Sequence, residues 1–164
     1  MFYDKDDIEK KAKKAFLENA NFFKQLKKRV PSNLDEVVFE LHRDAFNKID
    51  CLLCANCCRS LGPRITDRDI EKLSRNLKIR PSDFTEKYLR IDEDGDFVFK
   101  SMPCPFLGSD NYCSVYNERP KACREYPHTD DRKFYQKIDI TLKNTLTCPA
   151  VSEIVEGLKL TYKK

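Results

Sequence analysis

The cysteines of this chain are the residues whose type and spacing point to chemistry. Four of the eight lie within one short stretch, which we call the hook, at Cys51, Cys54, Cys57 and Cys58. The other four follow one at a time, at Cys104, Cys113, Cys123 and Cys148. Thiolates are soft ligands that select zinc, copper(I) or iron–sulfur clusters over magnesium or calcium. The layout therefore predicts a metal centre in which all eight cysteines are ligands.

Two cofactors are compatible with this pattern, zinc and an iron–sulfur cluster. Zinc would require two tetrahedral four-cysteine sites, or one such site plus spare thiols. The C-x2-C-x2-C spacing followed later by Cys148-Pro149 is similar to a ferredoxin pattern, although there the fourth cysteine is only three residues further on. The side chains of the neighbours Cys57 and Cys58 are expected to diverge, which is awkward for a single tetrahedral ion. We therefore give a slight preference to iron–sulfur over zinc.

A disulfide scaffold is the alternative use of an even number of cysteines. The first residues have neither the basic nor the apolar region of a secretory signal. No apolar run approaches the roughly 20 residues of a membrane span. We therefore expect a cytoplasmic protein with no membrane partner, in a compartment where thiols stay reduced and dense cysteines indicate metal binding. A bond between Cys57 and Cys58 would also need a strained turn.

Composition indicates a soluble chain with a small hydrophobic core. Of 164 residues, 40% are hydrophobic and 35% charged, so ligand bonds would add substantially to folding stability. We expect a single domain over 1–164, with an N-terminal helical segment at 1–47 and a cysteine-cluster region at 48–160. The net charge of +4 is small, and no basic stripe with interleaved aromatics indicates nucleic acid.

Helical patterns outnumber strand patterns among the elements that must position these cysteines. Apolar spacing predicts helices at 6–30, 34–47, 66–77, 81–89 and 149–160. Ser32 with Asp35, and Thr66 with Asp69, form capping-box pairs, whereas Pro81 and Pro149 suit first helical positions. The fold class is therefore mainly α, a small α+β protein of short helices and one β-hairpin around a cysteine-ligated metal centre.

Three segments need separate predictions. A hairpin is expected at 91–99 around Asp94-Gly95, whose acidic residues lack the spacing of a calcium loop. The hook is expected to be irregular backbone, so that its thiolates converge. Residues 134–142 fit a helix and a strand equally well and are left open.

Cys148 lies immediately before Pro149, so it is expected at the N-cap of the last helix. There the helix dipole and the unpaired amides favour a thiolate. A ligand role for Cys148 is therefore predicted, against the alternative of a small buried hydrophobe.

Basic residues beside the cysteines could balance the negative charge of a thiolate centre. They are Arg59, Arg64, Arg119, Lys121 and Arg124. Arg119 and Arg124 are preferred because they lie between prolines and Cys123. His128 is expected to be a loop residue, and His42 is left unassigned.

Together these patterns resemble a known family. The residues that carry the resemblance are the C-x-x-C-x-x-C-C hook, Cys104-Pro, Cys113-Ser, Arg119-Pro-x-x-Cys123 and Cys148-Pro. They resemble the YkgJ-type cysteine-cluster family over roughly 48–160, which implies chelation of zinc or iron. A related module occurs in flagellin lysine N-methylases. The family's hook usually has glycine where this chain has Ala55, which would matter if that position needs a positive φ.

Three classes of function follow. The first is a metal-binding protein with a structural, metal-handling or electron-transfer role, and it is preferred because no other catalytic groups are evident. The second is a protein-modifying enzyme similar to the lysine N-methylases, although no glycine-rich nucleotide loop is present. The third is a metal-stapled interaction module that binds a protein partner through its lysine-rich first helix.

Overall fold

The structure, a computed structural model, describes residues 4–163 and divides into two compact units. The first unit contains the chain up to Asn56 and again from Pro127, and the second unit is Cys57–Tyr126. The division therefore falls at 56/57 and 126/127. That the two units form one domain stays a prediction.

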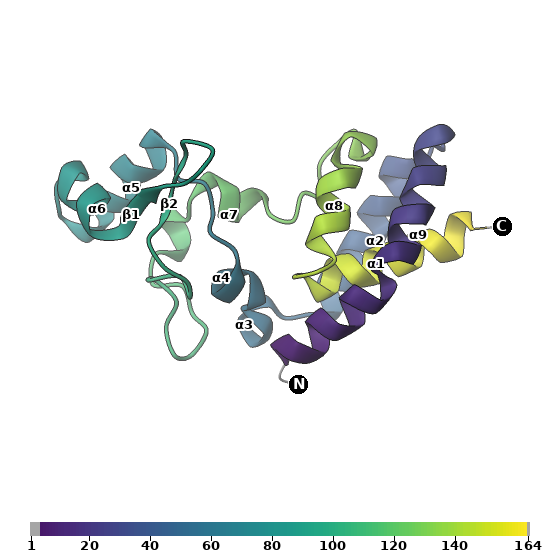
Figure 1. The fold of residues 1–164 in the computed structure, drawn as a ribbon, viewed down its shortest axis with the longest axis horizontal. Coiled ribbons are helices and arrows are strands. Elements are labelled where there is room, and N and C mark those ends of the chain that lie inside the picture. The colour runs from purple at the N-terminus through teal and green to yellow at the C-terminus, as the bar shows by residue number, and fades with distance from the viewer. Residues whose placement is uncertain (1–3, 164) are drawn as a thin grey trace. The chain divides into compact units, whose positions relative to one another are not determined.

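The first unit is helical. It contains α1 (Lys5–Lys28), α2 (Leu34–Lys48), α3 (Cys51–Cys54), the 3-10 helix η2 (Phe134–Lys137), α8 (Ile138–Asn144) and α9 (Pro149–Tyr162). Figure 1 shows α1, α2, α8 and α9 packed together. Their shared core includes Phe23, Val38, Phe134, Ile154 and Leu158, each at most 2% exposed. The segment before the hook thus packs against the chain's last helix.

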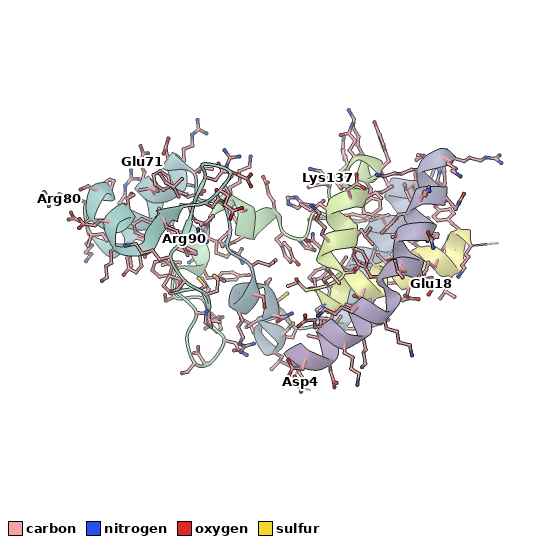
Figure 2. The ribbon with its side chains drawn as sticks, in the orientation of Figure 1. Asp4, Glu18, Glu71, Arg80, Arg90 and Lys137 are labelled. Carbon is pink, nitrogen blue, oxygen red and sulfur yellow. The ribbon has the colours of Figure 1, made fainter. Side chains whose placement is uncertain are left out.

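Ion pairs join α1 to α9 at the edge of this core. Glu18, labelled on α1 in Figure 2, accepts from Lys163 at 2.7 Å and lies 3.4 Å from Lys159 Nζ. Lys159 also pairs with Glu156 at 2.6 Å, and its side chain is only 6% exposed. The buried ammonium thus has two carboxylate partners.

The second unit carries the hairpin and most of the loops. It contains α4 (Asn56–Ser60) from its second residue onward, α5 (Asp67–Leu77), α6 (Pro81–Tyr88), β1 (Leu89–Ile91), β2 (Phe97–Phe99), the 3-10 helix η1 (Tyr116–Glu118) and α7 (Lys121–Glu125). The two strands pair antiparallel, with Leu89 opposite Phe99. Its core is a smaller aromatic cluster in which Phe106 contacts Phe84, Tyr88 and Phe99.

Most of the predicted elements are confirmed, and so is the mainly α fold class. The Thr66–Asp69 capping box is present, Pro81 and Pro149 begin their helices, and Gly95 in the hairpin turn has φ of 82°. Residues 134–142, which were left open, are helical. No helix in residues 4–163 combines the length and apolar character needed to cross a membrane.

Two local predictions are wrong. Ser32 does not cap α2, because Asn33 occupies the N-cap position and makes no side-chain cap. Asp35 instead accepts the amides of Lys133 and Phe134, at 2.8 and 2.9 Å, and so begins η2. The hook is not irregular backbone either, since its cysteines lie on α3 and α4.

Candidate metal centre

The hook consists of two helical turns separated by one left-handed residue. Asp50 caps α3 by accepting the amide of Leu52 at 2.8 Å. Cys51 and Cys54 are three residues apart in one turn, so they lie on the same side of it without irregular backbone. Ala55 then has φ of 45° and ψ of 17°, ends α3, and directs the chain into α4. The positive φ considered for this glycine-like position is therefore observed.

The side chains of Cys57 and Cys58 do not diverge, contrary to the expectation from the sequence. Their Sγ atoms lie 4.0 Å apart. Two thiolates on one tetrahedral zinc would be about 3.8 Å apart, given Zn–S bonds near 2.3 Å. The pKa of Cys58 is lowered from 9.0 to about 7, first by its hydrogen bond with Cys57 and then by the charges of Arg59 and Arg119, against desolvation. The geometric objection to zinc at this pair is thus removed.

Four thiols of the second unit lie close enough to influence one another. The negative charge of Cys58 raises the pKa of Cys104, Cys113 and Cys123, and the charges of Cys104 and Cys113 also raise that of Cys123. Desolvation is the largest cause in each case, and it takes Cys104 to a pKa of about 11 and Cys123 to about 12. Cys123 nevertheless keeps exposed surface. We call these residues the four-thiol group.

Backbone amides near two cysteines of the four-thiol group favour the thiolate form. The amides of Phe106 and Leu107 lower the pKa of Cys104, and the amide of Val115 lowers that of Cys113. Phe106 and Val115 are buried in the aromatic core, so each loop is fixed two residues after its cysteine. Such amide donors suit metal-bound sulfur, which carries negative charge.

Hydrogen bonds fix the loops of the four-thiol group to one another and to α5. The amide of Cys104 donates to the carbonyl of Cys58 at 2.9 Å, and that of Ser114 to the carbonyl of Phe106 at 2.9 Å. Asp69, only 2% exposed, uses one oxygen in its capping box and the other to accept the amide of Lys121 at 3.0 Å. Because Lys121 begins α7, Asp69 positions the helix that carries Cys123.

Arg119 is the basic residue whose charge acts on three of the thiols. Arg119 lowers the pKa of Cys58, Cys113 and Cys123 through its charge. Its guanidinium lies 3.5 Å from the ring centroid of Tyr116. Its Nε is buried without a hydrogen-bond partner in the part of the chain that the structure describes.

The other basic residues near the cysteines have different partners and therefore different roles. Arg59 bonds to Asn111 and adds positive charge beside Cys58. Arg124 donates to the carbonyl of Arg119 and so fixes that residue. Arg64 pairs with Asp96 at 2.9 Å, and Lys121 pairs with Glu125 at 3.6 Å. The positive charges of Arg64 and Lys121 are therefore balanced by carboxylates at the surface.

Three cysteines form a second group in the first unit. The charges of Cys51 and Cys54 raise the pKa of Cys148, which places Cys148 near the first turn of the hook. Buried Asn56 donates from Nδ2 to the carbonyl of Thr147 at 2.8 Å, and so holds the chain immediately before Cys148. We call Cys51, Cys54 and Cys148 the three-thiol group.

Cys148 is the N-cap residue of α9, as predicted. Its pKa is nevertheless raised to about 12, mainly by desolvation. The amides of Ala150 and Val151 lower the pKa, but no capping hydrogen bond forms to the side chain. The amides at the helix terminus thus favour the thiolate, but burial outweighs them in the metal-free thiol. A bound cation would reverse this balance.

All eight cysteines are thiols, with no disulfide among the residues described. No three His, Cys, Asp or Glu side chains within residues 4–163 already converge on one metal position. His128 is a loop residue as expected, and its Nδ1 lies 3.2 Å from Asp131. His42 is half-buried and bonds to buried Thr129 at 2.8 Å, so it is part of the helical unit's packing.

Sequence reasoning missed Asn56 and the positioning bond from Asp69 to Lys121. Both act over long separations, 91 residues for Asn56 and 52 for Asp69, so no local pattern indicates them. The capping box at Asp69 was predicted, but the use of its second carboxylate oxygen was not.

Comparison with known proteins agrees with this cysteine arrangement. A curated protein of Methanocaldococcus jannaschii, "Uncharacterized protein MJ0661", is 29% identical over 82 residues, covering 48% of this chain and 44% of that protein. The chain thus spans less than half the length of this relative. No solved structure matches the chain. The model of a family described as "CxxCxxCC: Putative zinc- or iron-chelating domain" matches residues 50–149, and the chain therefore belongs to that family.

Proposed function

We propose that this chain is a metal-binding protein whose thiolates hold zinc or iron, with the four-thiol group as its principal ligand set. The observation that carries the proposal is the match of residues 50–149 to a family described as a "Putative zinc- or iron-chelating domain", and the 2.9 Å bond from the Cys104 amide to the Cys58 carbonyl supports it, because it brings two cysteine segments together. Four thiolates complete a tetrahedral zinc site or bind one [4Fe–4S] cluster. The family's description is consistent with either metal.

The protein around these thiols fits a negatively charged centre. A divalent ion with four thiolates carries a net negative charge, which needs compensation when buried. Arg119 and Arg59 supply positive charge beside Cys58, and the amides of Phe106 and Val115 favour ionised sulfur. The buried Nε of Arg119 is a donor that metal-bound sulfur could accept from.

A structural role is the best-supported use of such a centre. The core of the second unit is small, its loops carry Cys104 and Cys113, and the short helix α7 carries Cys123. In such a domain the free energy of metal binding becomes free energy of folding. The metal would then hold these loops in place.

Elemental analysis of protein purified under reducing, oxygen-free conditions tests the proposal. We expect zinc or iron in at least stoichiometric amount. Iron with labile sulfide and a brown colour would identify an iron–sulfur cluster, and zinc without visible absorption a tetrathiolate site. Protein that contains neither metal and binds neither when reconstituted would overturn the proposal.

A further inference from the structure

The long first helix, α1, carries a concentration of positive charge that the metal centre does not use. Residues 10–28 contain seven lysines and one acidic residue, Glu18. The carboxylate of Glu18 lies 3.4 Å from Lys159 and 2.7 Å from Lys163, so it is already paired with lysines outside α1. The lysines of this segment are therefore not balanced by an acid within it.

Two of the seven lysines have carboxylate partners elsewhere. Lys13 pairs with Glu9 at 2.5 Å, and Lys27 pairs with Asp139 at 2.6 Å. The remaining five form no ion pair within residues 4–163, and all five are exposed. They are Lys10, Lys11, Lys14, Lys24 and Lys28.

Four of these unpaired lysines lie on one line along the surface of α1. With two intervening residues they are spaced four, three, four, three and four positions apart, which keeps side chains on one face of an α-helix. At 1.5 Å per residue the line is about 27 Å long. The buried residues of α1, which include Ala12, Phe23 and Leu26, lie on the opposite face. We call this line the basic row, and it consists of Lys10, Lys14, Leu17, Asn21, Lys24 and Lys28.

An apolar side chain in the middle of the basic row narrows the class of partner. Leu17 is 76% exposed, and its neighbours in the row are Lys14 and Asn21. The phosphate groups of a nucleic acid would pair with the lysines but would offer this leucine no apolar surface. A membrane would require an apolar helix face, whereas that face of α1 is buried in the helical core. The row therefore favours a protein that presents carboxylates together with an apolar side chain.

We propose that the basic row binds an acidic helix of a partner protein, which lies along α1 and covers Leu17 with an apolar side chain. Helices that pack side by side meet through residues with alternating spacings of three and four, which is the spacing of the row. Carboxylates at the matching positions of the partner face the four lysines, and this charge pairing selects the partner and speeds association. The inference concerns α1 alone and does not depend on the proposed metal binding.

Binding of a synthetic acidic helix to the full chain tests this proposal. The probe is a fluorescein-labelled peptide of about 20 residues, long enough to span the row, with glutamates opposite the lysines and leucine opposite Leu17. A peptide of the same composition in scrambled order has the same charge but no helical face, so it is the reference. Fluorescence anisotropy gives both dissociation constants. We expect the designed peptide to bind about tenfold more tightly than the scrambled one, and more weakly as salt is added.

Substitutions in the row should weaken this binding, and matched substitutions elsewhere should not. Changing all four lysines of the row to Gln should reduce the affinity by about tenfold or more, and Leu17→Gln by about fivefold. Gln is a good helix former, and circular dichroism checks that each variant is folded. The control variant changes four exposed lysines outside α1 to Gln and should leave the affinity unchanged. The control positions are Lys72, Lys78, Lys87 and Lys143.

Equal binding of the two peptides, or equal losses in the two quadruple variants, would overturn the proposal. Tighter binding to vesicles that contain anionic lipid, or to a single-stranded oligonucleotide, than to the designed peptide would also overturn it, because the row would then suit a membrane or a nucleic acid. None of these results would alter the metal content of the protein, so they leave the proposed function intact. Absence of metal would in turn leave the peptide result unaffected.

Discussion

Arg119 lowers the pKa of three cysteines of the four-thiol group without being a metal ligand itself. Its charge acts on Cys58, Cys113 and Cys123. Its guanidinium lies 3.5 Å from the ring centroid of Tyr116, and its backbone carbonyl accepts from Arg124. Residues that bond to metal ligands typically change metal affinity 10- to 100-fold when mutated. Arg119 is therefore the non-cysteine residue with the clearest expected effect on the centre.

We predict that Arg119→Gln weakens metal binding roughly tenfold, because it removes the positive charge beside the thiolates. Competition with a chromophoric chelator measures the affinity. Arg64→Gln is the control, since Arg64 pairs with Asp96 and should leave affinity unchanged. Arg119→Lys loses the planar contact with Tyr116 but keeps the positive charge. Because the charge is kept, its metal affinity should be much closer to that of the unsubstituted protein than the affinity of Arg119→Gln is. Equal affinities for Arg119→Gln and Arg64→Gln would show that the charge has no role.

Cys58 should react before Cys104, Cys123 and Cys148 in the metal-free protein. Its pKa is lowered to about 7, whereas those of Cys104, Cys123 and Cys148 are raised to 11 or above. Only the thiolate is nucleophilic, so alkylation at Cys58 should rise as pH increases through about 7. Peptide mass spectrometry after brief iodoacetamide treatment at several pH values identifies the site. Preferential labelling of Cys104 at pH 7 would contradict the prediction.

Ala55 has a backbone conformation that glycine adopts without strain. We predict that Ala55→Gly stabilises the protein by about 1 kcal/mol, because φ is 45° and a Cβ is disfavoured there. Ala15→Gly in α1 is the matched control and should destabilise by about the same amount, since its backbone is helical. Urea denaturation of both variants measures the difference. A loss of stability in Ala55→Gly would show that the strain is not significant.

At the scale of elements, the short α7 depends on a side chain from another helix. It has no side-chain cap of its own, and the amide of its first residue, Lys121, is accepted by Asp69 of α5. Asp69 also closes the capping box of α5 with Thr66. One buried carboxylate thus determines the start of two helices, the second of which carries Cys123.

We predict that Asp69→Ala lowers stability by about 1–2 kcal/mol and also weakens metal binding at the four-thiol group. The stability loss follows from the lost cap, and the lost affinity from the unfixed α7. Asp67→Ala in the same first turn is the control, because Asp67 is exposed and outside the capping box. Urea denaturation and chelator competition give the two quantities. Unchanged metal affinity in Asp69→Ala would mean that α7 is positioned by other contacts.

Elements with local signals were predictable from the sequence, and those determined by distant partners were not. Thr66 with Asp69, Pro81 and Gly95 each predicted a helix start or turn from neighbouring residues alone, and the structure confirms them. Residues 134–142 stayed ambiguous because their helix begins where Asp35, 98 residues earlier, accepts the amide of Lys133. The link between the hook and the chain before Cys148 was likewise hidden, since it depends on the bond from Asn56 to Thr147, 91 residues apart.

At the scale of the whole molecule, the two units differ in how much apolar core each contains. The first unit buries a large cluster from α1, α2, α8 and α9. The second buries a smaller cluster, against which Cys104 and Cys113 pack. Burial of apolar surface stabilises the first unit without a metal. If the proposed function holds, the second unit depends more on its metal ligands.

Metal removal should therefore affect the two units unequally. We predict that complete chelation under reducing conditions abolishes amide-exchange protection across much of 57–126 while α1, α2 and the C-terminal part of α9 stay protected. Residues near Cys51 and Cys148 should lose protection only locally, because the helices around them share the apolar core. Hydrogen–deuterium exchange with mass spectrometry resolves these segments, and zinc or iron re-addition is the control for reversibility. Equal loss of protection in both units would show that the metal centres stabilise the whole chain, and unchanged protection in 57–126 would show that its aromatic core is sufficient alone.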